Sequence, residues 1–314
     1  MSVDAELLAR HPLSILGPTA SGKSSLAMAL VAMLADLGHT AELVSIDSMQ
    51  VYRGMNVGTA TPTVAEQAEV RHHLIDVVDP WETFTVSEFQ RLANDAITDI
   101  TARGAIPILV GGTGLYLRSV IDNLTIPGQF PDVLAELENE PDTVALHRRL
   151  QDLDPVAADR MEPNNRRRVL RALEVTLGSG QPFSSFGPGL ETYPASRFVQ
   201  VALRWDRDQL DQRIEQRYQH QLDEGFFDEV RWLAENSPSR TARQALGYRE
   251  LLDVLEGEMT LDEAVELAIV RTRQFARKQL RWFRRDPRVQ WIDAPPEPAT
   301  VLRMWSDSVR SLRD

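Results

Sequence analysis

The chain has 314 residues, a formal net charge of −12 and no cysteine, so disulfides, thiol nucleophiles and cysteine–zinc sites are excluded. Hydrophobic residues make up 43% of the sequence, which is enough for the core of one large or two modest domains. No apolar run is long enough to span a membrane and no secretory pattern opens the chain, so we expect a cytoplasmic protein with no membrane partner.

The first predicted elements surround a phosphate-binding loop. Residues 13–16 are typical of a short buried strand, and residues 25–37 form a helical run that ends before Gly38. Between them, Gly-Pro-Thr-Ala-Ser-Gly-Lys-Ser at 17–24 matches G-x-x-x-x-G-K-[ST]. In such a loop, backbone N–H groups surround phosphate oxygens, the lysine adds charge and the last hydroxyl holds Mg²⁺. The predicted phosphate ligands are Gly17, Thr19, Ala20, Ser21, Gly22, Lys23 and Ser24, with Ser24 also the metal ligand.

Two further strands are predicted in the first part of the chain. Residues 43–46 and 106–110 are short apolar runs, and a helical pattern at 86–103 lies between them. This alternation predicts an α/β fold, a P-loop-type parallel sheet wrapped by helices. Ligands bind at the carboxyl ends of such strands, where the sequence places the phosphate loop, Asp47 and the Gly-Gly-Thr-Gly segment at 111–114.

A change in composition predicts a small all-helical insertion domain at 125–194. Pro and Gly residues lie at both ends of this segment, and helical patterns occupy 144–153 and 166–177. The chain would then complete the core with a strand at 198–203, helices at 207–236, 245–256 and 261–285, and a strand at 289–292. We therefore predict a core from 1–124 and 195–314 that is interrupted by the insertion.

Asp47 ends the second predicted strand and has three interpretations. It could hold a metal, act as a general base for an acceptor beside the phosphates, or cap the next turn. The strand before Gly111 ends without the acidic residue that an ATPase usually has there, which favours group transfer with Asp47 as base. The glycines around Thr113 would let the backbone approach a ligand closely. His72 and His73 lack metal-ligand spacing and are expected to be structural or exposed.

Arginine-rich segments concentrate positive charge in two places on this acidic chain. One includes Arg166–Arg168 and Arg171; in the other, at 271–288, arginines recur every four residues from 273 to 285 and form a stripe on one helix face. This pattern favours contact with a nucleic-acid backbone over a solvated face paired with acids. Arg213 and Arg217, one helical turn apart, either neutralise charge on a diphosphate or are ordinary surface residues.

Together the motifs resemble those of the bacterial tRNA dimethylallyltransferase family, also called isopentenyl-tRNA transferases. The matching segments are 17–24, 46–60, 72–76 with 79–80, 110–116, 154–155, 171–175, 246–250 and 272–279. The resemblance implies transfer of a dimethylallyl group from dimethylallyl diphosphate to the exocyclic amine of the adenosine 3′-adjacent to a tRNA anticodon, with release of diphosphate. The sequence departs from many relatives at Thr61, where they have lysine, and at Leu134, near which they have arginine.

The resemblance also implies roles for individual residues. Asp47 would be the general base, Thr113 would face the reaction centre, and Arg217 would stabilise the leaving diphosphate. Arg213 would be a further diphosphate ligand, and Ser24 would share Mg²⁺ with the diphosphate. The implied contacts to the tRNA anticodon stem-loop are Asp47, Ser48, Met49, Gln50, Thr113, Arg167, Arg168, Arg171, Arg273, Arg277, Lys278 and Arg281. We expect a monomer.

Three other classes of protein match part of the pattern. A P-loop small-molecule kinase would use Asp47 as the base for a hydroxyl, and an adenylate isopentenyltransferase would modify a free nucleotide. Neither of these enzymes gives a role to the two arginine-rich segments. A nucleotide-binding switch would need an N-K-x-D segment, which the sequence lacks.

Overall fold

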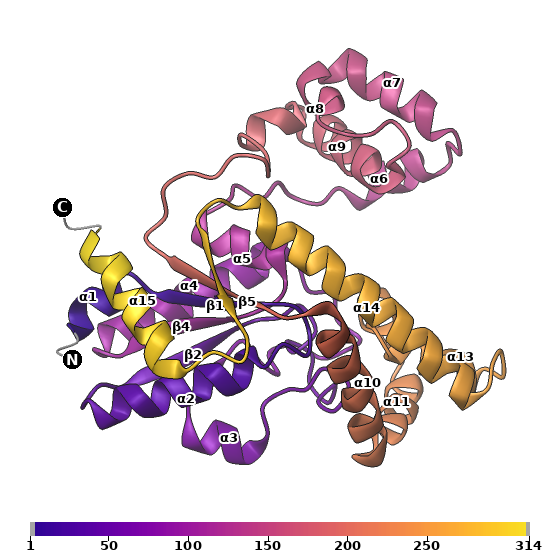
Figure 1. Ribbon diagram of the computed structural model, residues 1–314. Helices are drawn as coiled ribbons and strands as arrows, with labels where there is room; N and C mark the ends of the chain where they lie inside the picture. The colour runs from indigo at the N-terminus through magenta and orange to yellow at the C-terminus, as the bar shows by residue number, and fades with distance from the viewer. Residues whose placement is uncertain (1–3, 312–314) are drawn as a thin grey trace. The chain divides into compact units, whose positions relative to one another are not determined.

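The computed structural model describes residues 4–311 and contains a sheet of six parallel strands (Figure 1). The strands are β1 Leu13–Leu16, β2 Ala41–Ile46, β3 His72–His73, β4 Ile106–Gly111, β5 Val199–Arg204 and β6 Val289–Asp293. Their order across the sheet is β3-β2-β4-β1-β5-β6. The parallel sheet and the five predicted strands are confirmed, and β3 is an addition.

Helices cover both faces of this sheet, which explains why its central strands are almost continuously apolar. All residues of β1, β2 and β4 are buried. Side chains alternate between the faces. On one face, Leu16 and Ile46 belong to a core cluster with Phe89 of α4 (Val86–Ala102). On the other face, Ile15 belongs to a second cluster that includes Leu30 of α2 (Lys23–Asp36).

Eleven helices accompany the sheet in the described part of this unit. They are α1 Ala5–Arg10, α2 Lys23–Asp36, α3 Val64–Glu69, α4 Val86–Ala102, α5 Gly114–Ile121, α10 Arg207–Asp223, α11 Phe226–Glu235, α12 Arg240–Arg243, α13 Tyr248–Leu255, α14 Leu261–Arg285 and α15 Pro298–Ser311. Between residues 4 and 311, none of the helices combines the length and apolar character needed to cross a membrane.

Glycines correct two of the predicted helices. The single helix predicted at 207–236 is wrong, because the chain forms α10 and α11 with Gly225 between them at a φ of 92°. The helix predicted from residue 245 begins only at Tyr248, after Gly247 at a φ of 85°. Both values lie in the left-handed region, which glycine enters without steric cost and which cannot continue a right-handed helix.

Residues Asp122–Pro194 form a second compact unit with a core of its own. It contains α6 Pro131–Glu138, α7 Thr143–Leu153, α8 Pro155–Asp159, α9 Arg166–Ser179 and a 3₁₀ turn at Phe183–Phe186. Leu146, Leu150 and Leu173 are at most 2% exposed and pack in this core. The buried Asp154 caps α8 by accepting from the backbone N of Ala157 and ties in the 3₁₀ turn through the backbone N of Ser184.

Candidate active site

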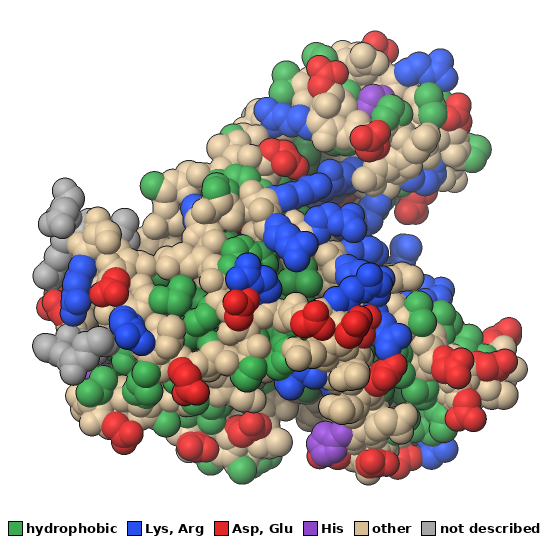
Figure 2. Space-filling model, viewed as in Figure 1, with side chains coloured by type: hydrophobic (Ala, Val, Ile, Leu, Met, Phe, Trp, Pro, Cys, Tyr) green, Lys and Arg blue, Asp and Glu red, His purple; other side chains and the backbone are tan. Residues whose placement is uncertain are grey.

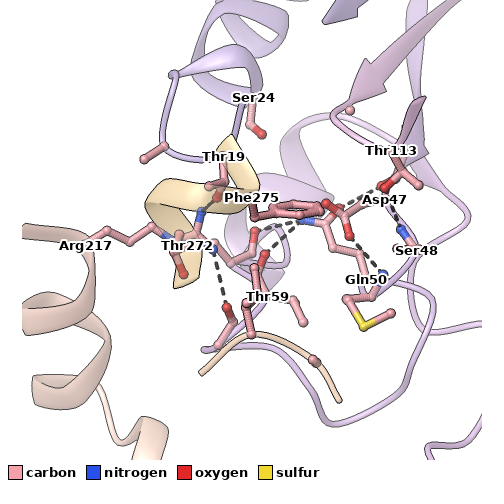
Figure 3. Close-up of a pocket in the computed structure, with 18 of the residues that line it drawn as sticks. Thr19, Ser24, Asp47, Ser48, Gln50, Thr59, Thr113, Arg217, Thr272 and Phe275 are labelled. Carbon is pink, nitrogen blue, oxygen red and sulfur yellow. Dashed lines mark hydrogen bonds between the residues drawn. The ribbon is translucent and has the colours of Figure 1, made fainter. Parts of the chain in front are cut away.

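A pocket of about 410 Å³ lies where β1, β2 and β4 end. The start of α2 contributes Lys23 and Ser24, and the segments after β2 and β4 contribute Asp47 and Thr113. The loop at 58–62 and helices α10, α13 and α14 line other parts of the pocket. Thr19 and Arg217 lie on one side of the pocket, and Asp47, Ser48 and Thr113 lie on the other (Figure 3). The fold therefore brings together residues that are far apart in sequence, as expected from strand ends that meet at one edge of a sheet.

The phosphate loop turns tightly ahead of α2. Ala20 has a φ of 61° and Gly22 a φ of 81°, which turns the backbone so that successive amides can face one anion. The ammonium of Lys23 donates to Pro18 O at 3.3 Å. Burial lowers the pKa of Lys23 to about 8, although the negative charge of Asp47 raises it, and the positive charge of Arg217 lowers it further. An anionic ligand beside Lys23 would offset both the burial and the repulsion.

The two arginines of α10 contact the phosphate loop in different ways. Arg213 donates from Nε to Ala20 O at 2.8 Å and stacks 4.5 Å from the ring centroid of Trp205. Arg217 donates to the Thr19 hydroxyl at 3.0 Å and lines the pocket. Burial lowers the pKa of Arg217. Arg217 therefore lines the pocket, whereas Arg213 supports the loop and is not part of the pocket lining.

Asp47 makes the turn-capping contact, which is one of its three interpretations, and it also faces the pocket. Its Oδ1 accepts from the backbone N of Met49 at 2.9 Å, which is the turn-capping contact. The half-buried carboxylate also lines the pocket, so the cap orients a group that remains exposed to a ligand. Thr113 Oγ1 accepts from the backbone N of Ser48 at 3.3 Å, which ties the β4 end to the turn after β2 (Figure 3).

Gln50 enters the same pocket with both ends of its amide engaged. Its Oε1 accepts from the Ser45 hydroxyl at 2.7 Å. Its Nε2 donates to Ala60 O at 3.0 Å and to Thr59 O at 3.4 Å. The position of Gln50 is therefore fixed from one end by Ser45 and from the other by the loop at 59–60.

The glycines at the end of β4 lie very close to protein atoms, and Gly111 also lines the pocket. A Cβ on Gly111 would lie 2.1 Å from Ile46 O, and one on Gly112 would lie 2.3 Å from Gln279 Nε2. Gln279 of α14 accepts from the backbone N of Thr19 and donates to Gly112 O, both at 2.9 Å. The glycines thus let α14 link the phosphate loop to the segment that carries Thr113.

The arginine stripe on α14 is only partly available to a nucleic acid. Arg273 pairs with Glu215 and lies 3.8 Å from Asp211, and Arg277 lies 3.6 Å from the same aspartate. Lys278 and Arg281 are exposed, and Figure 2 shows a band of Lys and Arg side chains over α14. The alternative of a helix face paired with acids therefore holds for the half of the stripe nearer the start of α14.

In the helical unit, the predicted tRNA contacts also differ from one another. Arg167 and Arg168 are exposed. Arg171 instead pairs with Glu174 at 2.9 Å and donates to Pro127 O at 2.8 Å, which holds the start of this unit against α9. Arg171 thus has a structural role within the unit.

The histidines at 72–73 have structural contacts, in line with the expectation. His73 Nε2 lies 2.6 Å from Glu42, and His72 Nδ1 lies 2.8 Å from Val70 O. Among residues 4–311, no group of three or more His, Cys, Asp or Glu side chains is arranged to hold a metal.

Known proteins resemble this chain over most of its length. A family model described as IPP transferase matches residues 50–286. The tRNA dimethylallyltransferase of Bifidobacterium longum subsp. infantis is 46% identical over 290 residues, which is 91% of this chain and 88% of that protein. The chain belongs to the IPP transferase family.

Solved structures agree with this assignment. The crystal structure of the full-length tRNA isopentenylpyrophosphate transferase from Bacillus halodurans matches with a TM-score of 0.69 at 38% identity, over 96% of this chain and 99% of that one. A eukaryotic dimethylallyltransferase acting on tRNA matches with a TM-score of 0.74 at 27% identity, over 96% of this chain and 77% of that one. The six-stranded sheet is therefore an IPP transferase core.

Sequence reasoning missed two side chains that line this IPP transferase pocket and one at its edge. Gln279 lies in the segment 272–279 that resembles the family. The helical period that exposes Arg277 and Arg281 places Gln279 on the buried face of the helix. Phe275, 38% exposed, lines the pocket from the same helix. Glu229 of α11 binds the loop at 56–58 and has no motif that could have identified it.

Proposed function

We propose that this protein transfers the dimethylallyl group of dimethylallyl diphosphate to the exocyclic amine of the adenosine 3′-adjacent to the anticodon of tRNAs and releases diphosphate. Relatives named tRNA dimethylallyltransferase, and a similar enzyme described as acting on tRNA, support this reaction. The observation that carries the proposal is that the phosphate loop and Asp47 line opposite sides of one pocket.

The acceptor amine requires a base. An adenine amine is a poor nucleophile, because its lone pair is delocalised into the ring. As the bond forms between this nitrogen and the first carbon of the allyl group, the nitrogen must lose a proton. A carboxylate within hydrogen-bond range accelerates such a step, and the Met49 contact orients Asp47 for it. Thr113, beside Asp47, would hydrogen-bond the acceptor or the reacting group.

The leaving diphosphate requires positive charge. As the bond between carbon and oxygen breaks, negative charge grows on the diphosphate, where Lys23, Arg217 and the loop amides would stabilise it. Ser24 lines the pocket, and its hydroxyl would be the metal ligand. Mg²⁺ usually takes one or two protein oxygens and completes its shell with water and phosphate oxygens, so a single hydroxyl fits it. Bound there, Mg²⁺ would neutralise diphosphate charge.

The nucleic-acid partner would be the anticodon stem-loop. Bases in RNA loops can be splayed out for recognition, and an enzyme that modifies a base must take it out of the stack. Ser48, Met49 and Gln50 line the pocket on the Asp47 side and would contact the extracted base. Exposed cations on both units would bind phosphates: Arg167, Arg168, Lys278 and Arg281. One copy of the chain supplies all these groups, so we propose an active monomer.

A transfer assay with radiolabelled dimethylallyl diphosphate and Mg²⁺ tests the proposal. The acceptors are an anticodon stem-loop with adenosine next to the anticodon, the same stem-loop with guanosine there, and free AMP. We expect label only in the adenosine stem-loop, and its loss when EDTA removes Mg²⁺. Label in AMP would indicate a free-nucleotide enzyme, and phosphate transfer from ATP without prenyl transfer would indicate a kinase.

A further inference from the structure

Glu229 of α11 accepts four hydrogen bonds at the edge of the pocket. Its Oε2 accepts from the backbone N of Asn56 at 2.7 Å and of Val57 at 2.8 Å. Its Oε1 accepts from the backbone N of Gly58 at 3.0 Å and from the Tyr248 hydroxyl at 2.5 Å. A carboxylate offers about four lone-pair sites, so Glu229 has no acceptor capacity left for a substrate.

The carbonyl side of the same loop is held from α10. The buried Gln221 donates from Nε2 to Val57 O at 2.6 Å and to Gly58 O at 3.0 Å. Gly58 itself packs so closely that a Cβ would lie 2.2 Å from the ring of Phe226 and 2.5 Å from the ring of Tyr248. The hydrogen bonds to the backbone N–H groups, the hydrogen bonds to the carbonyls and the close packing at Gly58 together hold this segment in place.

We call these contacts of Glu229 and Gln221 the Glu229 clamp. The loop that the clamp holds contacts side chains on both sides of the pocket. Gly58 O accepts from Arg217 at 3.4 Å, and Arg217 in turn donates to the Thr19 hydroxyl of the phosphate loop. The next two carbonyls, of Thr59 and Ala60, accept from Gln50 on the base side. One segment, residues 56–60, thus contacts a side chain proposed for diphosphate and a side chain proposed for the adenine.

We propose that Glu229 is a positioning residue, which places Arg217 and Gln50 together by fixing the loop at 56–60. The inference rests on the proposed function for the identity of the two substrates. Hydrogen bonds to an ionised carboxylate are roughly twice as strong as neutral ones, so this side chain dominates the loop's position. Loss of the clamp displaces both Arg217 and Gln50, so binding of both substrates should weaken together. A defect in one substrate site alone would weaken the binding of only one substrate.

Glu229→Gln tests the clamp with little change in side-chain shape. One carboxylate oxygen becomes an NH₂ group, which cannot accept hydrogen bonds from the donors that it faces. We expect KM to rise about 10-fold for dimethylallyl diphosphate and about 10-fold for the adenosine stem-loop, with a lower kcat. Glu235→Gln, the same change at an exposed position of α11, is the matched control and should behave as wild type. Tyr248→Phe keeps the three backbone contacts and should have a smaller effect on both KM values.

A double-mutant cycle with Gln50→Ala separates positioning from folding. In the wild-type background, Gln50→Ala should raise KM for RNA alone; in the Glu229→Gln background its further effect should shrink, because Gln50 is already displaced. A lower melting temperature with both KM values unchanged would reduce Glu229 to a structural role and overturn the proposal. Should Glu229→Gln not fold, Gln221→Met removes only the two carbonyl contacts and takes its place. Failure of the wild-type protein to transfer label would instead refute the proposed function.

Discussion

Asp47 is a turn residue whose side chain also faces a pocket. A carboxylate that only capped the turn after β2 would have no need of a pocket, yet this one lines a cavity with Lys23 and Thr113. The contact with the Met49 backbone occupies Oδ1 and fixes the plane of the group. Capping therefore orients the carboxylate, and its place in the pocket lining suits the general-base role proposed for it.

Asp47→Asn isolates the chemical role of this residue. Asparagine keeps the shape and can still accept from the Met49 N–H, but it takes no proton from the amine. We expect the single-turnover rate to fall about 10²- to 10⁴-fold, the usual contribution of general acid–base catalysis. Stem-loop affinity should change by less than about threefold, because phosphate contacts supply most of RNA binding. Asp36→Asn, at an exposed position on α2, is the control. Near-normal turnover of Asp47→Asn would show that another group is the base.

At the scale of elements, the edge of the sheet is held by a buried charge cluster. Glu42 of β2 is 5% exposed, accepts from Arg103 Nη2 at 2.9 Å and lies 2.6 Å from His73 of β3. The hydrogen bonds from Arg103, followed by that from His73, lower the pKa of Glu42 from 4.5 to about 2, against an opposing effect of burial. The cluster explains how a strand of two residues stays paired, since β3 has little apolar surface to bury.

Glu42→Gln should destabilise the fold by about 2 kcal/mol at pH 7, because it removes the charged acceptor shared by Arg103 and His73, although Asp99 still pairs with Arg103. The folded-state pKa is depressed, so the stabilisation is present above the unfolded pKa near 4.5 and is lost as the pH falls toward 2. Urea unfolding at pH 7 and pH 3 should therefore show a smaller difference from wild type at the lower pH. Glu69→Gln, at an exposed position, is the control, and an equal difference at both pH values would contradict this assignment.

Features with a local sequence signal could be predicted from the sequence, and features that depend on contacts between distant residues could not. The phosphate loop and Asp47 were predictable, because their signals are local and parallel strand ends meet at one edge. The strand β3 was not, since His72 and His73 show no apolar pattern and His73 is held by Glu42, about thirty residues away. The Glu229 clamp was not predictable either, because its donors at 56–58 are backbone groups, which every residue type carries.

At the scale of the whole molecule, the chain contains separate hydrophobic cores. The two clusters that cover the sheet include no residue of the helical unit, and the cluster around Leu150 includes only residues of that unit. The Ser196 hydroxyl donates to Ile121 O at 3.0 Å, so the two points where the chain leaves and re-enters the core lie together. A unit inserted in this way can be removed without cutting through a core.

Replacement of Asp122–Pro194 by a short Gly-Ser linker should leave a core that unfolds cooperatively and binds inorganic diphosphate within about threefold of wild type, because the phosphate loop, Lys23 and Arg217 remain. RNA affinity should fall, and the slope of log K against log salt should shrink by about 1 to 2, as expected for the loss of two phosphate contacts. Arg167→Gln with Arg168→Gln in the full chain keeps the unit and removes only its charges, so it should give the same change in slope. An unchanged slope in both proteins would exclude the helical unit from the RNA-binding surface, and failure of the shortened chain to fold would show that its core depends on that unit.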